Sequence, residues 1–100
     1  MAGRVFHFSV TPGTTIPLQA TTSLFGLHLG LQVKAATGNT GTIWLGATSN
    51  VTAGSTATTN LATNGYPLAA GDSVLFPCAT ADQLWLLSPT TSQQAYLFGQ

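Results

Sequence analysis

The chain has 100 residues, a mass of 10.3 kDa, a formal net charge of zero and only four charged side chains. This length fits one small domain, and the charged fraction of 4% is far below the roughly 25% usual for soluble domains. The two cations, Arg4 and Lys34, are 30 positions apart and cannot neutralise a run of phosphates. The composition therefore argues against nucleic-acid binding.

The fold class follows from which residues are abundant and which are missing. Threonine is the commonest residue, at 17 of 100, and glutamate is absent. Threonine is β-branched, and the long charged side chains that cover helix surfaces are nearly absent, so strands are favoured. We predict an all-β chain, with residues 1–100 forming a single compact antiparallel β-sandwich or small jelly roll of six to eight strands.

The first half of the chain contains three alternating segments. Residues 5–10 place Phe6, Phe8 and Val10 on one face of a strand, and residues 1–20 are predicted to form an extended N-terminal arm or edge strand. Alternation is longest at residues 25–34, where His28 lies on the less apolar face. After a turn-rich break, residues 42–47 alternate again, and we expect these last two strands to form a hairpin.

The second half begins with a segment that is poor in apolar residues. Residues 48–65 are predicted to be a surface loop, and a loop of this length is a candidate contact element. Turn residues then bracket three further predicted strands, at residues 73–76, 84–87 and 95–99.

No segment is long or apolar enough to direct the chain to a membrane. The longest apolar stretch, residues 24–31, is far shorter than the roughly 20 residues that span a bilayer. Residues 1–10 lack the pattern of a secretion signal, so we expect synthesis in the cytoplasm without export. Cys78 is the only cysteine, which excludes an internal disulfide. A small domain without such a crosslink is expected to gain stability by oligomerisation.

The residues that support catalysis or metal binding are scarce. The only acids, Asp72 and Asp82, fall in predicted turns, and no nucleophile elbow is present, so we expect no enzyme activity. His7, His28 and Cys78 lack metal-ligand spacing, and no cofactor is expected. His28 is read as a hydrogen-bonded interface histidine, the alternative being three copies of it on a symmetry axis around an ion.

Several predicted strands are apolar on both faces. Trp44 opposes Ile43 and Leu45, and Trp85 opposes Leu84 and Leu86. A free sandwich buries only one face of each sheet, so the second face needs cover from another chain. This pattern favours permanent assembly.

Three motifs in the middle of the chain carry a resemblance to a protein family. They are, in chain order, Gly41-Thr42-Ile43-Trp44-Leu45-Gly46, Val51-Thr52 and Asn64-Gly65-Tyr66-Pro67-Leu68-Ala69-Ala70-Gly71-Asp72-Ser73-Val74. The chain resembles, over about residues 27–98, small β-sandwich accessory proteins of tailed-bacteriophage virions, including capsid decoration or cement proteins. The resemblance implies a non-enzymatic protein on the capsid exterior that binds the major capsid protein.

The expected site residues follow from this reading. We expect a homotrimer that clamps coat subunits, with Phe6, Phe8 and Val10 contacting the capsid and with Trp44 and Trp85 as anchors between subunits. The alternative for Phe6, Phe8 and Trp85 is that they fill the monomer core.

Two other functions stay open from the sequence. One is a neck, fibre or tail protein whose loop at residues 48–65 touches a receptor. The other is a carbohydrate-binding module in which Trp44, Trp85 and Tyr66 stack on sugars.

Overall fold

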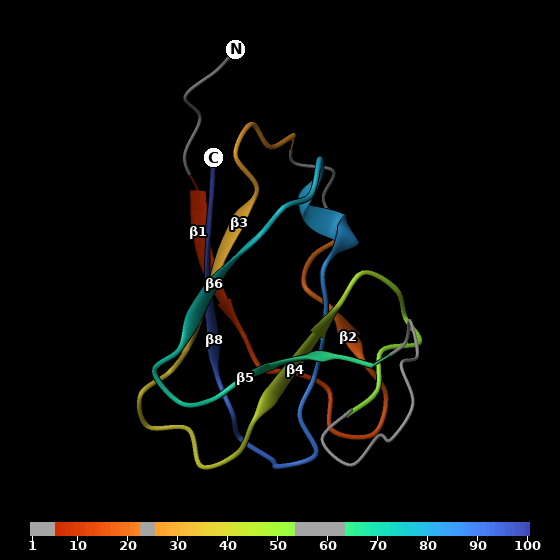
Figure 1. The fold of residues 1–100 in the computed structure, drawn as a ribbon, viewed down its shortest axis with the longest axis vertical. Helices are drawn as coiled ribbons and strands as arrows, with labels where there is room; N and C mark the ends of the chain where they lie inside the picture. The colour runs from red at the N-terminus through yellow and green to blue at the C-terminus, as the bar shows by residue number, and fades with distance from the viewer. Residues whose placement is uncertain (1–5, 23–25, 54–63) are drawn as a thin grey trace.

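A computed structural model describes residues 6–22, 26–53 and 64–100, which form two antiparallel four-stranded sheets and one short 3₁₀ helix (Figure 1). The elements are β1 (Phe6–Val10), β2 (Leu18–Gln19), β3 (Leu31–Ala35), β4 (Ile43–Gly46), β5 (Tyr66–Leu68), β6 (Ser73–Phe76), η1 (Ala81–Gln83), β7 (Trp85–Leu87) and β8 (Ala95–Gly99). No helix in these described ranges is long and apolar enough to cross a membrane.

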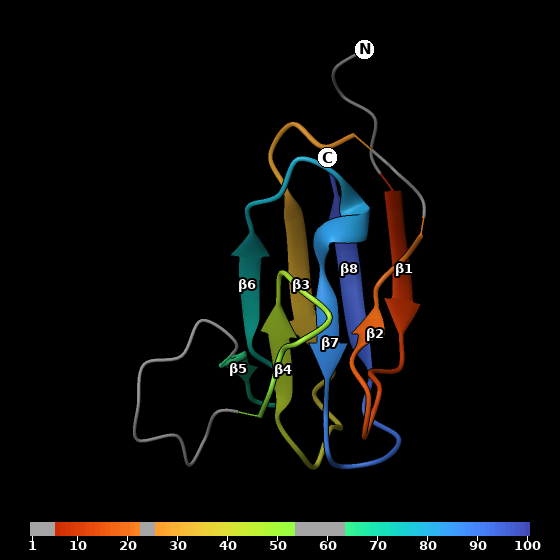
Figure 2. The same ribbon diagram turned by 90° about the vertical axis from the view of Figure 1, so that its right-hand side faces the viewer.

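The strand order is that of a jelly roll. The first sheet runs β1-β8-β3-β6 and the second runs β2-β7-β4-β5, and Figure 2 shows the second sheet lying over the first. The pairs β1–β8, β2–β7, β3–β6 and β4–β5 are all antiparallel, as in one long hairpin rolled into two layers. The predicted all-β sandwich is therefore confirmed.

The core lies between the sheets and follows the period-2 pattern of the sequence. In β3 and β8 every second residue is buried, so Leu31, Val33 and Leu97 point toward the second sheet. Ile43 and Leu86 meet them from the other layer, and both are fully buried. Each such aliphatic side chain stabilises the fold by about 1.5–3 kcal/mol.

The long strand predicted at residues 25–34 is shorter in the structure. Strand β3 begins at Leu31, because Gly30 has a φ of +98° that ends the extended run. The amides of His28 and Leu29 instead donate to the Gln100 carbonyl, at 2.8 and 2.7 Å. Leu29, which alternation placed on the apolar face, is 64% exposed.

The predicted hairpin between residues 25–34 and 42–47 is wrong. Strands β3 and β4 belong to different sheets, so the chain between them crosses from one layer to the other. Hydrogen bonds of side-chain amides hold this crossing segment, in the place where a hairpin would have backbone hydrogen bonds between its two strands. Asn39 exchanges two 2.9 Å hydrogen bonds with the Gln94 backbone, and Gln93 Oε1 accepts from the amides of Thr40 and Gly41 at 2.8 and 2.9 Å.

The region predicted as a surface loop at residues 48–65 has ordered ends. Thr52 forms a parallel bridge with Asn64, and the Gly65 amide donates to the Thr52 carbonyl at 2.8 Å. Val51 is 4% exposed, so this end of the loop packs on the sandwich. The centre of the predicted contact element, residues 54–63, lies outside the described residues.

Candidate binding face

The candidate site is the side of the first sheet that points away from the second sheet, which we call the outer face. Its eight members alternate with the core residues of the same four strands. They are His7, Ser9, Gln32, Lys34, Ser73, Leu75, Tyr96 and Phe98.

The register of the sheet arranges the outer face in two rows. Phe98 on the inner strand β8 lies opposite His7 of β1 and Gln32 of β3, and Gln32 lies opposite Leu75 of β6. Directly opposite residues have Cβ atoms about 4.5–5.5 Å apart, so these side chains are neighbours. The first row therefore consists of aromatic and aliphatic side chains, with the amide of Gln32 between Phe98 and Leu75.

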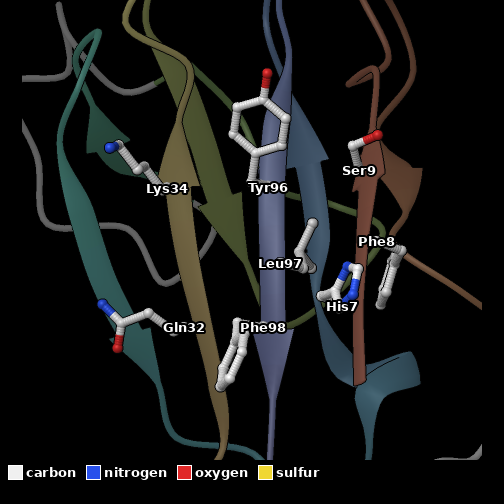
Figure 3. A pocket seen from close by; sticks show the side chains of 8 residues that line it. All are labelled: His7, Phe8, Ser9, Gln32, Lys34, Tyr96, Leu97 and Phe98. Atoms are coloured by element: carbon white, nitrogen blue, oxygen red, sulfur yellow. The ribbon is translucent and has the colours of Figure 1, made fainter. Parts of the chain in front are cut away.

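The second row is the polar one. Tyr96 lies opposite Ser9 on one side and Lys34 on the other, and Lys34 lies opposite Ser73 of β6. Figure 3 shows the Tyr96 ring on β8 between Ser9 and Lys34, with Phe98 further along the same strand. One strand thus presents two aromatic rings on one face of the sheet.

The exposed apolar side chains of the outer face are neighbours and form one patch. Tyr96 is 52% exposed, Phe98 and Leu75 are each 50% exposed, and Leu29 adjoins them. Two shallow depressions meet at Gln32 and Phe98, one reaching His7 and Lys34 and the other reaching Leu29 and Leu75. Exposed apolar patches of this kind mark interaction sites in soluble proteins.

Lys34 is the charged group of this face. Its ammonium has no carboxylate partner within the described residues. The two acids of the chain are engaged locally, since Asp72 Oδ2 accepts from the Ala69 amide at 3.2 Å and Asp82 Oδ1 accepts from the Thr80 hydroxyl at 2.6 Å. Asp72 precedes Ser73, which faces Lys34, but its side chain closes its own turn.

The outside of the second sheet differs, because the chain covers it. Trp44 is 7% exposed and packs with Val51 and Leu87 in a small second cluster, against which the half-buried Trp85 also packs. A Cβ on Gly65 would stand 2.7 Å from Trp44 Cβ, so only glycine lets the chain approach this closely. The expected companion chain is therefore not needed to bury Trp44, because the residues after β4 supply the cover.

The structure places the other expected contact residues at one edge of the first sheet. Strand β1 lies at an edge of the first sheet and pairs with β8 alone. Phe8 and Val10 are half-buried and pack against the core, and for Phe8 this is the position that the core-filling alternative gave it. Phe6 lies in β1, but its side chain is outside what the structure describes.

His28 and the remaining candidate ligands do not converge. His28 is exposed in a bend, and no group of three or more His, Cys, Asp or Glu residues that could hold a metal occurs in the described part of the chain. Cys78 is half-buried, and burial raises the pKa of its thiol. The structure brings His7, but not His28, to the outer face.

Sequence reasoning did not single out Tyr96, Phe98 or Lys34. The signal was present at residues 95–99, where Tyr96 and Phe98 alternate with small or aliphatic residues. Either face of that strand could have faced the core, and only the pairing of β8 between β1 and β3 decides which one does.

Comparisons with protein-family models, with curated proteins and with solved structures find no match to this chain. The candidate site therefore depends on the geometry of the outer face.

Proposed function

We propose that this chain is a non-enzymatic structural protein of a bacteriophage virion, which decorates the capsid exterior as a homotrimer and clamps neighbouring coat subunits. The observation that carries the proposal is the outer face, where Tyr96, Phe98 and Leu75 are half-exposed on a chain with four charged residues. Such a face binds by apolar contact and needs no turnover.

Two further features support this assignment. The jelly-roll strand order is one that viral capsid proteins and lectins use, although a fold alone does not assign a function. Residues 64–74, the longest of the three motifs that resemble the phage proteins, form β5, a turn and the start of β6. Within it Gly71 has a φ of +83° and Leu68 is 2% exposed, so the motif identifies fold positions.

The size of the exposed patch bears on how the protein would bind. Aromatic side chains cover about 150–250 Å² each, so two half-exposed rings with Leu29 and Leu75 offer roughly 400 Å² of apolar area. At about 25 cal/mol per Å² this area contributes about 10 kcal/mol, comparable with the roughly 4–15 kcal/mol cost of association. One face would bind weakly, and a trimer with three faces would bind firmly through avidity.

The test is the amount of this chain in purified virions of the phage that encodes it. We expect quantitative mass spectrometry to find a copy number that scales with the coat protein, and a Phe98→Ser variant to be lost from the particles. Ile16→Ser is the matched control, since Ile16 is 77% exposed and lines neither depression of the outer face. Absence of the chain from virions, or about one copy per particle, would reject capsid-wide decoration.

Attachment is expected to withstand salt. The outer face carries one lysine and otherwise binds through uncharged groups, so there are few ion pairs to screen. Particles washed at about 0.1 M and about 1 M NaCl should retain the same copy number to within a few-fold. Release of the intact protein by salt alone would contradict an apolar interface.

Copy number also separates decoration from a neck, fibre or tail position, where few copies are expected.

For a carbohydrate-binding module, the stacking residue Trp44 is unavailable because it is buried, whereas Tyr66 is 58% exposed. Binding of the isolated chain to a glycan array, with loss in Tyr66→Ser, would favour that function.

A further inference from the structure

The polar row of the outer face restricts the chemistry of what docks there. The hydroxyl groups of Ser73 and Tyr96, which lie opposite Lys34, can accept from its ammonium, but neither of them carries a negative charge. A desolvated ammonium is costly unless it is paired with an anion. Because no carboxylate of the described residues pairs with Lys34, the charge has to be matched from outside.

The apolar row defines the other half of the ligand. The roughly 400 Å² of apolar area is below the roughly 800 Å² per partner of a standard interface, so the polar row must be covered as well. Phe98 and Lys34 are diagonal neighbours on adjacent strands, about 7–8 Å apart. Residues two positions apart in an extended segment are separated by nearly the same distance.

A second copy of this chain bound face to face does not fit these requirements. Lys34 lines one depression of the outer face and no Asp or Glu side chain lines either depression, so two such faces would each leave a lysine without a carboxylate side chain opposite it. A sugar fits less well than a protein, because Leu75 and Leu29 adjoin Phe98 and aliphatic side chains offer no stacking surface.

We propose that the outer face docks an acidic-apolar protein segment, in which an apolar side chain rests on Phe98 and Leu75 while a carboxylate two positions away along an extended strand pairs with Lys34. The inference deepens the proposed function, on which it rests, by naming the chemistry of the coat-protein surface that this face contacts. The apolar residue supplies affinity and the carboxylate fixes the register of the segment.

In the experiment, a library of displayed random peptides is selected for binding to the full-length protein. The peptide sequences enriched by the wild-type protein are compared with those enriched by the Lys34→Glu variant. Wild type should enrich Asp or Glu two positions from an aromatic or aliphatic residue, and Lys34→Glu should enrich Lys or Arg at that position. A synthetic peptide from the wild-type selection should bind several-fold more weakly when its acid is changed to the amide, and this difference should vanish in Lys34→Gln.

The controls separate the face from the fold. Phe98→Ser should abolish enrichment, while Ile16→Ser should leave it unchanged, and near-ultraviolet circular dichroism should show that both variants are folded. The inference would be overturned if the wild-type protein enriched peptides without a preference for acids, or if Lys34→Glu kept the same preference for acids. It would also be overturned if the wild-type protein enriched peptides no more than Phe98→Ser does. Concentration-dependent self-association through Phe98, or binding of anionic oligosaccharides in place of peptides, would also overturn it.

Failure here is distinguishable from failure of the proposed function. A Lys34→Glu protein that stays on virions at full copy number would leave the chain a decoration protein while removing the acidic partner. Absence of the wild-type chain from virions would reject decoration, whatever the peptides show.

Discussion

Gln93 is a buried amide that joins the crossing between the two sheets to the start of the last strand. It is 3% exposed, its oxygen accepts from the amides of Thr40 and Gly41, and its nitrogen donates to the Thr91 carbonyl at 2.8 Å. The side chain thus satisfies backbone groups that no strand ladder reaches.

Replacing Gln93 with leucine should therefore destabilise the protein by about 1–3 kcal/mol, because the Thr40 and Gly41 amides and the Thr91 carbonyl lose their partner. The measurement is the free energy of unfolding from urea titration. Gln94→Leu is the matched control, since its side-chain bond to Thr11 Oγ1 is exposed and should matter less. Equal losses in the two variants would contradict a structural role for the buried amide.

Cys78 gives the chain a pH dependence at the alkaline end. Desolvation by burial raises the pKa of the Cys78 thiol, a hydrogen bond with the Leu31 backbone lowers it, and the charge of Asp82 raises it further. The folded state therefore favours the neutral thiol. This contribution to stability is complete below the ordinary thiol pKa of about 8.5 and is lost as the pH rises through the raised value.

The expected result is that wild type loses more stability than Cys78→Ala between neutral and strongly alkaline pH, measured as the urea midpoint at each pH. The difference between the two proteins isolates the thiol from the other groups that titrate there. Parallel curves for the two proteins would show that the thiol is not held neutral by the fold.

At the scale of elements, the segment after β4 acts as a cover for the second sheet. Val51 packs on Trp44, and a Cβ on Gly46 would come within 2.5 Å of Val51 Cβ, so the segment lies directly on the strand. Val51→Ala should cost about 1–3 kcal/mol through the lost methyl groups and the cavity they leave. In a Trp85→Phe background, the emission of Trp44 should shift to the red.

Ser49→Ala is the matched control for the cover, because Ser49 is exposed in the same segment. It should leave both the stability and the Trp44 emission unchanged. An unshifted emission in Val51→Ala would mean that Trp44 is buried by something other than this segment.

The positions of strands could be predicted where they depend on a local alternation pattern, whereas the pairing of strands distant in the sequence could not. Strands β1, β4, β6, β7 and β8 were predicted, and the alternation in β3 was found, because period 2 over about four or five residues of sequence is a strong signal. Strands β2 and β5 were missed because they have two and three residues, too few to alternate.

The partners of the strands could not be predicted from the same pattern. The break at residues 36–42 has turn composition, and a hairpin and a crossing look alike there. In the structure, hydrogen bonds with Gln93 and Gln94, more than 50 positions away, hold the crossing. For the same reason the alternation pattern pointed to Trp44 as an anchor between subunits and gave no indication of Phe98.

At the scale of the whole molecule, the jelly-roll strand order places the last strand, β8, in the interior of the first sheet. Strand β8 lies between β1 and β3, and its register joins Gly99 to both Phe6 and Leu31. The first and last strands of the described chain therefore meet only when the fold is nearly complete. Contacts this distant make folding slow, on the order of milliseconds to seconds.

Deleting residues 95–100 should accordingly unfold the protein rather than fray one end. The deletion removes the partner of β1, one of the two partners of β3, and the buried Ala95 and Leu97. The expected far-ultraviolet circular dichroism is that of an unfolded chain without a urea transition. Phe98→Ser keeps the strand and its ladder and removes only a half-exposed ring, so that variant should retain the spectrum and a cooperative transition. A cooperative transition in the deletion protein would show that the two sheets hold together without their central strand.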